Sequence, residues 1–231
     1  EAELAHEFAR NGMRNLAYPS IVAAGENACV LHYTENDQKL KDGDLLLIDA
    51  GAEYQNYASD ITRTFPINGQ FSPAQRQLYD VVLDAQLAAI DTIRPGTPWN
   101  APHDAAVRVL TQGLVRLGLL KGKPSSLIRS EAYRKFYMHR TGHWLGMDVH
   151  DVGDYKLKDE WRLLEPGMVL TVEPGLYVPA DCQAVDKQWR GIGIRIEDDA
   201  LVTSEGVRTT ITGGLDDPQM AAWLSKNAGK K

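Results

Sequence analysis

A motif that carries an acid at the end of an apolar run occurs twice in the sequence, and this repetition constrains the fold more than any other feature. Residues 43–51 and 167–175 each begin with a glycine, include a short apolar run, reach an acid and end on a glycine two residues later. In both places another apolar run with its own acid follows. The four acids are Asp49, Asp60, Glu173 and Glu197. The repetition predicts two related halves that face each other, each contributing two carboxylates.

The periodicity of apolar residues predicts a mixed α+β chain in which strands come first, helices follow and strands return. The expected strands are Ile21–Ala24, Cys29–Leu31, Leu45–Ala50, Glu53–Tyr57, Ile61–Pro66, Met168–Val178 and Ile192–Val202. The expected helices are one closed by Gly12, one that begins at Ser72-Pro73, two over about Pro102–Leu117 and Ser125–Phe136, and one that begins near Asp217. No linker is long enough to divide the chain, so one domain over residues 1–231 is expected.

Three of the four acids lie in strongly apolar contexts. Asp49 follows LLLI, Glu173 follows MVLTV, and Glu197 lies within GIGIRIEDD. A single acid of this kind is usually solvated at a strand end, but a buried carboxylate is costly unless it is paired or bound to a metal. Four carboxylates that converge would repel one another, and a cation offsets that repulsion. Oxygen ligands favour a hard divalent ion such as Mn²⁺ or Mg²⁺.

Three of the six histidines, His139, His143 and His150, lie within twelve positions and are flanked by glycines that permit close backbone approach. The spacing does not match the H-E-x-x-H zinc helix, and the two cysteines form no zinc-binding pair. A ligand set of carboxylates with one imidazole suits a dinuclear hydrolytic centre better than a structural zinc site.

Arg195 lies two residues before Glu197, so on a strand both side chains point to one face. Three roles fit this position: a hydrogen bond to a site carboxylate, a contact with a substrate carboxylate, or a surface salt bridge.

Composition narrows the class of protein. The net charge of −6 argues against a nucleic-acid partner, and no apolar run approaches membrane-spanning length. With two cysteines and no signal-peptide pattern, a cytoplasmic location is expected. The chain begins with Glu1 in what reads as the end of a helix, so we expect sequence upstream of it.

Six stretches resemble the bacterial Xaa-Pro aminopeptidases (aminopeptidase P), a branch of the pita-bread metallopeptidases that also include prolidase and methionine aminopeptidase. These stretches are Val30–Asn36, Leu46–Gly51, Ser59–Pro66, His143–Gly153, Leu164–Tyr177 and Arg190–Asp199. The resemblance implies an α+β pita-bread fold, with two pseudo-symmetric halves and a curved β-sheet covered by helices on its outer face. It also implies that the chain is a catalytic domain without its first part and without an upstream N-terminal domain.

The resemblance implies a role for each site residue. Asp49 would chelate one metal, Asp60 and Glu197 would bridge both metals, and His143 and Glu173 would complete the second. The residues that would contact the substrate are His32, His139, His150, Tyr177 and Arg195. The family usually works with two Mn²⁺ ions, is cytoplasmic in bacteria and forms homo-oligomers.

The expected reaction is hydrolysis of the bond between an N-terminal residue and a following proline, with peptides that carry proline at the second position as partners. A metal-bridging hydroxide would be the nucleophile and Glu173 both a metal ligand and the general base, while His139 or His150 would stabilise the oxyanion. A prolidase that cleaves Xaa-Pro dipeptides and a non-catalytic peptide-binding pita-bread module are the alternatives. One departure stands out: familiar members read His-Gly-x-Ser-His where this chain has His139-Arg140-Thr141-Gly142-His143, which leaves the substrate preference of this loop open.

Overall fold

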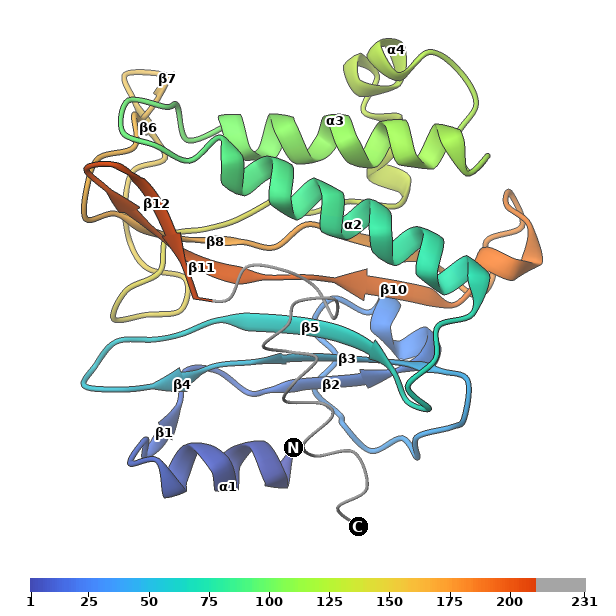
Figure 1. Ribbon diagram of the computed structural model, residues 1–231, viewed down its shortest axis with the longest axis horizontal. Helices are drawn as coiled ribbons and strands as arrows, with labels where there is room; N and C mark the ends of the chain where they lie inside the picture. Colours follow the sequence, from blue (N-terminus) through green and yellow to red (C-terminus); the bar gives the residue numbers. More distant parts are fainter. Residues whose placement is uncertain (211–231) are drawn as a thin grey trace.

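The computed structural model describes residues 1–210, and the helix predicted near Asp217 lies outside the described residues. The chain is mixed α+β, as predicted, and it forms two halves whose strands lie side by side, with a pair of long helices next to the second half (Figure 1). No helix among residues 1–210 combines the length and the apolar character needed to cross a bilayer.

The first half is a small antiparallel sheet. Its strands β2 (Ile21–Ala24), β3 (Leu45–Ala50) and β5 (Ile61–Pro66) match three of the predicted strands, and their order in the sheet is β2-β3-β5. Beside them, β1 (Asn15–Leu16) pairs with β4 (Ala52–Glu53). The helix α1 (Ala2–Arg10) precedes β1, and Gly12, with φ +88°, follows its last turn.

The second half places its strands next to those of the first. Strands β8 (Val169–Val172), β11 (Asp198–Thr203) and β12 (Gly206–Thr209) form one antiparallel sheet in the order β12-β11-β8. Strand β9 (Gly175–Val178) pairs with β10 (Ile192–Arg195). A short hairpin of β6 (Lys156–Leu157) and β7 (Glu160–Trp161) lies beyond the end of this sheet.

The long strands predicted over Met168–Val178 and Ile192–Val202 are therefore each interrupted. The first stops at Glu173-Pro174 and the second at Ile196-Glu197. Proline lacks the N–H that a sheet ladder requires, which accounts for the first interruption. At the second, the N–H of Glu197 donates to the carbonyl of Thr62 in β5, 3.1 Å away, so the backbone bonds to the other half of the molecule.

Two long helices cover one side of the second half. Helix α2 (Pro73–Asp91) begins with the predicted Ser72-Pro73, and the side chains and backbones of Ser72 and Gln75 form a reciprocal capping box. Helix α3 (Ala101–Arg116) packs along α2, and both lie across the strands of the second half (Figure 1). One large apolar cluster joins these helices to β8–β11, whereas the first half has a smaller cluster of its own.

Three local predictions are wrong. Cys29–Leu31 is not a strand, because Gly25, with φ +57°, begins the 3₁₀ helix η1 (Gly25–Cys29). The segment Glu53–Tyr57 turns instead of extending: Tyr54 and Tyr57 exchange backbone hydrogen bonds around two residues of positive φ.

The helix predicted over Ser125–Phe136 is also broken. It divides into α4 (Pro124–Arg129) and the 3₁₀ helix η2 (Ala132–Lys135), with Glu131 at φ +54° between them. A left-handed residue cannot continue a right-handed helix, so the chain changes direction there.

Candidate metal centre

The five predicted metal ligands line one cavity of about 550 Å³, named here the central cavity. Each comes from a different segment: Asp49 from β3, Asp60 from the residue before β5, and His143 from the loop that precedes β6. Glu173 and Glu197 occupy the two interruptions of the second-half strands. Residues that are far apart along the chain are thus brought together by the packing of the two halves.

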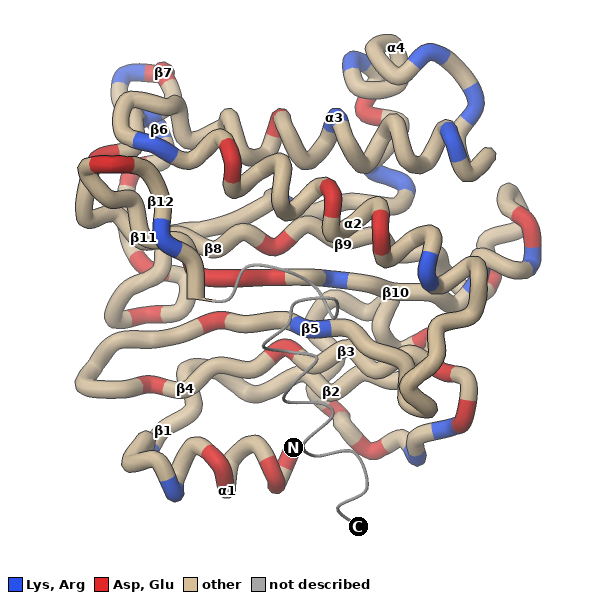
Figure 2. Tube along the Cα trace, viewed as in Figure 1, with Lys and Arg blue, Asp and Glu red and all other residues tan. Residues whose placement is uncertain are grey.

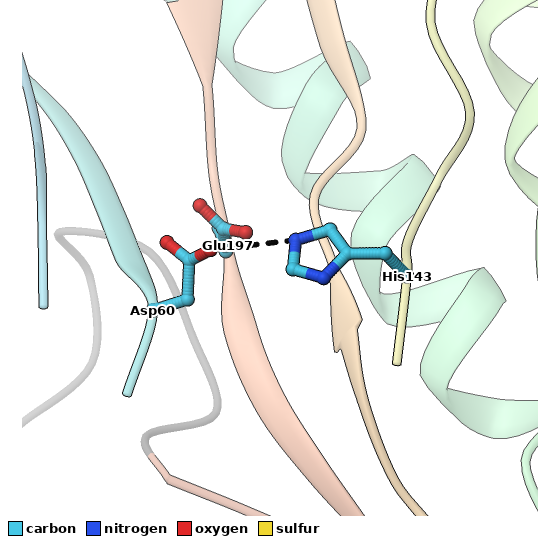
Figure 3. A group of neighbouring side chains, drawn as sticks. All are labelled: Asp60, His143 and Glu197. Carbon is cyan, nitrogen blue, oxygen red and sulfur yellow. Dashed lines mark ion pairs between the residues drawn. The ribbon is translucent and has the colours of Figure 1, made fainter. Parts of the chain in front are cut away.

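Three of these groups are close enough to share one ion. Atoms of Asp60, His143 and Glu197 all lie within 4.8 Å of one another (Figure 3). Nε2 of His143 is 3.4 Å from Oδ2 of Asp60 and 3.6 Å from Oε1 of Glu173. Nδ1 of the same ring is 2.9 Å from the carbonyl oxygen of Trp144. An Nδ1–H that donates to this carbonyl leaves the Nε2 lone pair directed at the carboxylates, which is the arrangement of a metal-binding histidine.

Burial disfavours the charged form of these carboxylates. It raises the pKa of Glu173 to about 7 and the pKa of Glu197 well above its ordinary value, and in both cases neighbouring carboxylates add to the effect. Burial also raises the pKa of Asp49, although the charge of Arg195 opposes it. Bound cations would offset this cost, so the donor set fits hard divalent ions.

Arg195 supplies part of the compensating charge. Its Nη2 lies 2.7 Å from Oδ2 of Asp49, and its Nη1 donates to the hydroxyl of Tyr177 across 3.0 Å. Because Arg195 is only 3% exposed, a surface salt bridge is excluded, and a hydrogen bond to a site carboxylate is what the structure shows. Figure 2 shows acidic positions on strands of both halves, with the basic residues of β5 and β10 among them.

The predicted substrate-binding residues divide into two groups. His32, His139, His150 and Arg195 line the central cavity, whereas Tyr177 is fully buried and does not. The hydroxyl of Tyr177 is instead 2.9 Å from Nε2 of His139. Tyr177 thus lies behind the cavity wall and holds both His139 and Arg195.

The histidines differ in how they are held. Both ring nitrogens of His139 have protein partners, since its Nδ1 is 2.8 Å from the carbonyl oxygen of Arg140. Burial lowers the pKa of His139 to about 4, so this ring is neutral at neutral pH. His150 packs edge-on against the ring of His143, with centroids 4.2 Å apart, and makes no hydrogen bond through its ring within residues 1–210.

Sequence reasoning did not predict the role of Tyr18. Its hydroxyl oxygen lies 2.5 Å from an oxygen of Asp49 and 2.5 Å from an oxygen of Asp60, joining two predicted ligands of the first half. Nothing near Tyr18 in the sequence indicates this contact, because it depends on how the segment before β2 packs against β3.

Two threonines that support the acids were also missed, although strand alternation could have found them. Thr62 donates to Oε2 of Glu197 across 2.5 Å, and Thr171 donates to Oε1 of Glu173 across 3.4 Å. Thr62 lies two residues after Asp60, and Thr171 two residues before Glu173. Residues two apart on a strand share a face.

Comparison with known proteins identifies relatives over nearly the whole chain. A profile of metallopeptidase family M24 matches residues 1–204. The chain is 56% identical to the Xaa-Pro aminopeptidase of Haemophilus influenzae over 206 residues, which is 89% of this chain and 47% of that protein. It is 55% identical to the Xaa-Pro aminopeptidase of Escherichia coli K12 over 231 residues, covering 100% of this chain and 52% of that protein.

Solved structures agree with the sequence relatives. Pseudomonas aeruginosa aminopeptidase PepP superimposes with a TM-score of 0.92 at 59% identity, over 97% of this chain and 52% of that one. The fold is therefore the predicted pita-bread fold. The chain spans about half the length of the curated relatives it matches.

Proposed function

Because the chain belongs to metallopeptidase family M24, we propose that it carries the active site of a two-metal aminopeptidase that cleaves the bond between an N-terminal residue and a following proline. One observation supports this proposal above the others: four carboxylates and one imidazole from five separate segments line a single cavity. The Xaa-Pro aminopeptidases that the chain resembles give the substrate class.

The proposal assigns two divalent cations, most simply Mn²⁺, to five ligand residues. These are Asp49, Asp60, His143, Glu173 and Glu197. When bound, such ions supply an activated water at neutral pH and a Lewis acid for the substrate carbonyl. Asp60, His143 and Glu197 would hold one ion, since their donor atoms all lie within 4.8 Å of one another, and Asp49 and Glu173 would complete the ligand set.

Proton transfer falls to Glu173. We infer that its carboxylate accepts a proton from the attacking water and delivers it to the proline nitrogen, because the amine can leave only as a protonated group. Oε2 of Glu173 lies 3.8 Å from Nδ1 of His139, so the carboxylate is placed at the wall where the predicted substrate-binding residues begin.

Oxyanion stabilisation is better assigned to His150 than to His139. Both ring nitrogens of His139 already have hydrogen-bond partners in the protein, whereas the ring of His150 lines the cavity without one among residues 1–210. His139 would then orient the peptide, with Tyr177 and Arg195 behind it. Because proline lacks an N–H and has a fixed φ, its ring needs a shaped surface of this kind.

The decisive experiment measures release of the first residue from Xaa-Pro peptides. The protein stripped of metal by a chelator should be inactive, and added Mn²⁺ should restore release of the residue that precedes proline. Peptides with alanine in place of that proline should be cleaved poorly. Metal-independent release, or equal cleavage of both peptides, would contradict the proposal.

The same assay separates the alternatives. A prolidase would cleave Xaa-Pro dipeptides and spare longer peptides, and a non-catalytic module would release nothing even when elemental analysis shows bound metal. A homo-oligomer, a cytoplasmic location and a single catalytic domain over residues 1–231 stay predictions, to be checked by light scattering, fractionation and limited proteolysis.

A further inference from the structure

The central cavity has a second chemical character beside its acidic ligand cluster. Beside Arg195, three aromatic side chains and a second arginine also line it: Trp99, Tyr155, Trp161 and Arg140. Two of the aromatic residues pack together, since the ring centroids of Trp99 and Tyr155 are 4.8 Å apart. This part of the cavity is apolar and cationic, whereas the ligand cluster is acidic.

Two contacts position the guanidinium of Arg140. Its Nη2 donates a hydrogen bond to Oδ1 of Asn100, the residue before α3. Its central carbon lies 5.3 Å from the ring centroid of Trp161 in β7, within the range of a cation–π interaction. The loop that carries Arg140 is thereby joined to a helix N-terminus on one side and to the β6–β7 hairpin on the other.

The charge of Arg140 is positioned but not neutralised. Within residues 1–210, no carboxylate lies within ion-pair distance of it, and the bond to Asn100 uses one of its five N–H groups. The side chain is exposed, so its other N–H groups face solvent, where a ligand in the cavity can reach them. Arg140 keeps most of them available at the wall of a cavity.

We propose that Arg140 binds the C-terminal carboxylate of a short Xaa-Pro-Xaa peptide whose N-terminal end lies at the acidic ligand cluster. This inference rests on the proposed function and adds a preference for short substrates. A guanidinium matches a carboxylate with two parallel N–H donors, which a lysine cannot do. The cavity, at about 550 Å³, is in the size range that encloses a small-molecule ligand, so both ends of a short peptide can contact it.

Three peptides test the inference with the metal-loaded full chain: Ala-Pro-Ala, its C-terminal amide, and Ala-Pro-Glu amide. Arg140→Ala should lower kcat/KM for the free acid by roughly tenfold or more, chiefly through KM, because a charge-assisted bond made equally in ground and transition states is lost. The amide of Ala-Pro-Ala should change less than about twofold, as expected when no charged partner is present. Arg140→Lys should restore only part of the loss.

Arg134→Ala is the matched control. Arg134 is an exposed arginine of the same region that pairs with Glu131 across 3.6 Å and does not line the central cavity. The Arg134→Ala variant should cleave all three peptides with the same kcat/KM as the unmodified protein. Metal content and melting temperature of each variant should match those of the unmodified protein.

Each result bears on the inference. An effect confined to Ala-Pro-Glu amide would overturn the inference, because it would mean that Arg140 recognises an acidic third side chain and not the C-terminal carboxylate. Equal losses for the acid and the Ala-Pro-Ala amide, or no loss for any peptide, would overturn the inference. If no peptide is cleaved, the proposed function fails separately, and calorimetric binding of the acid and the amide to both proteins still decides the role of Arg140.

Discussion

Glu197 combines nearly complete burial with a proposed role as a charged metal ligand. It is 1% exposed, its Oε2 accepts a bond from Thr62, and its backbone carbonyl accepts one from Arg63 across 2.6 Å. The side chain is therefore fixed before any ion arrives, which is what a metal ligand needs.

Glu197→Gln keeps the shape of the side chain and removes its charge. We expect loss of bound metal and a fall in activity of roughly 100-fold or more. Replacing even a residue that only hydrogen-bonds to a metal ligand commonly lowers metal affinity or activity by about 10- to 100-fold. Elemental analysis and the Xaa-Pro assay measure both. Glu205→Gln, at an exposed turn, is the matched control, and normal turnover of Glu197→Gln with unchanged metal content would refute the assignment.

Tyr18 offers a milder change at the same centre. Removing the hydroxyl in Tyr18→Phe should weaken metal binding by about 10-fold, because two ligand carboxylates lose the group that orients them. The ring stays, so the melting temperature of the metal-free protein should change little. Metal titration by calorimetry measures the affinity, and an unchanged affinity would show that Tyr18 only fills space.

These residues also show what a sequence can predict about a site. Three of the acids were identifiable because a carboxylate within an apolar run is unusual, and Asp60 was identifiable from the repeated motif. Tyr18 was not, because a tyrosine in a loop is ordinary and its partners are Asp49 and Asp60, more than thirty positions away. Local patterns indicate which residues are anomalous, and only packing determines their neighbours.

At the scale of elements, helix α2 supports the second half of the site through one buried side chain. Gln86, fully buried, donates from Nε2 to Oδ2 of Asp198 across 2.8 Å. Asp198 in turn pairs with Arg63 at 2.7 Å, and Arg63 donates to the carbonyl of Glu197. The helix is thus linked to a predicted metal ligand through two intermediates.

Gln86→Met preserves the volume of this side chain and removes its donor. The free energy of unfolding should fall by about 1–3 kcal/mol, the usual cost of leaving a buried charged group short of one hydrogen bond. Denaturant unfolding measures the loss. Gln77→Met, at an exposed position of the same helix, should be nearly neutral; an equal effect there would indicate a helix-wide cause.

The elements themselves were largely predictable, and their interruptions were not. Capping residues located α2 correctly, and apolar runs located β2, β3 and β5. The break at Glu197 left no signal, since its N–H bonds to Thr62 of the other half, and this pairing exists only in the folded molecule. The predicted strand over Glu53–Tyr57 is a turn because Gln55 and Asn56 have positive φ. Tight hairpin turns require positive φ, which asparagine adopts more readily than most residues.

At the scale of the whole molecule, the two halves meet through polar contacts that surround the metal centre. The side chain of Thr64 donates to the carbonyl of Arg195, the N–H of Asp60 donates to Asp199, and Arg195 pairs with Asp49. Bound cations would add ligand bonds from both halves to the same place. Metal binding should therefore stabilise the fold as a whole.

Removing metal should lower the melting temperature. At a free metal concentration 100 times the dissociation constant, the stabilisation is about 2.7 kcal/mol. Calorimetric scans with and without a chelator measure the difference. In Glu197→Gln, the two scans should coincide, and a persistent difference would place the stabilising metal elsewhere.

The repeated motif predicted two halves, each with two carboxylates, and the structure has them. It could not predict that α2 and α3 would both cover the second half, because amphipathic helices do not specify which sheet they cover.

The contacts between β5 and the segment from Arg195 to Asp199 restrict how the protein can move. A hinge that swung the halves apart would break these bonds and separate Asp60 from Glu197, dismantling the ion site at each cycle. In the proposed enzyme, entry of peptide and release of product would then depend on the rim of the central cavity, to which His32 and Trp161 of the β6–β7 hairpin belong. Pairs of spectroscopic labels that report distances should therefore show a changing distance across the rim and a constant distance between β5 and β11.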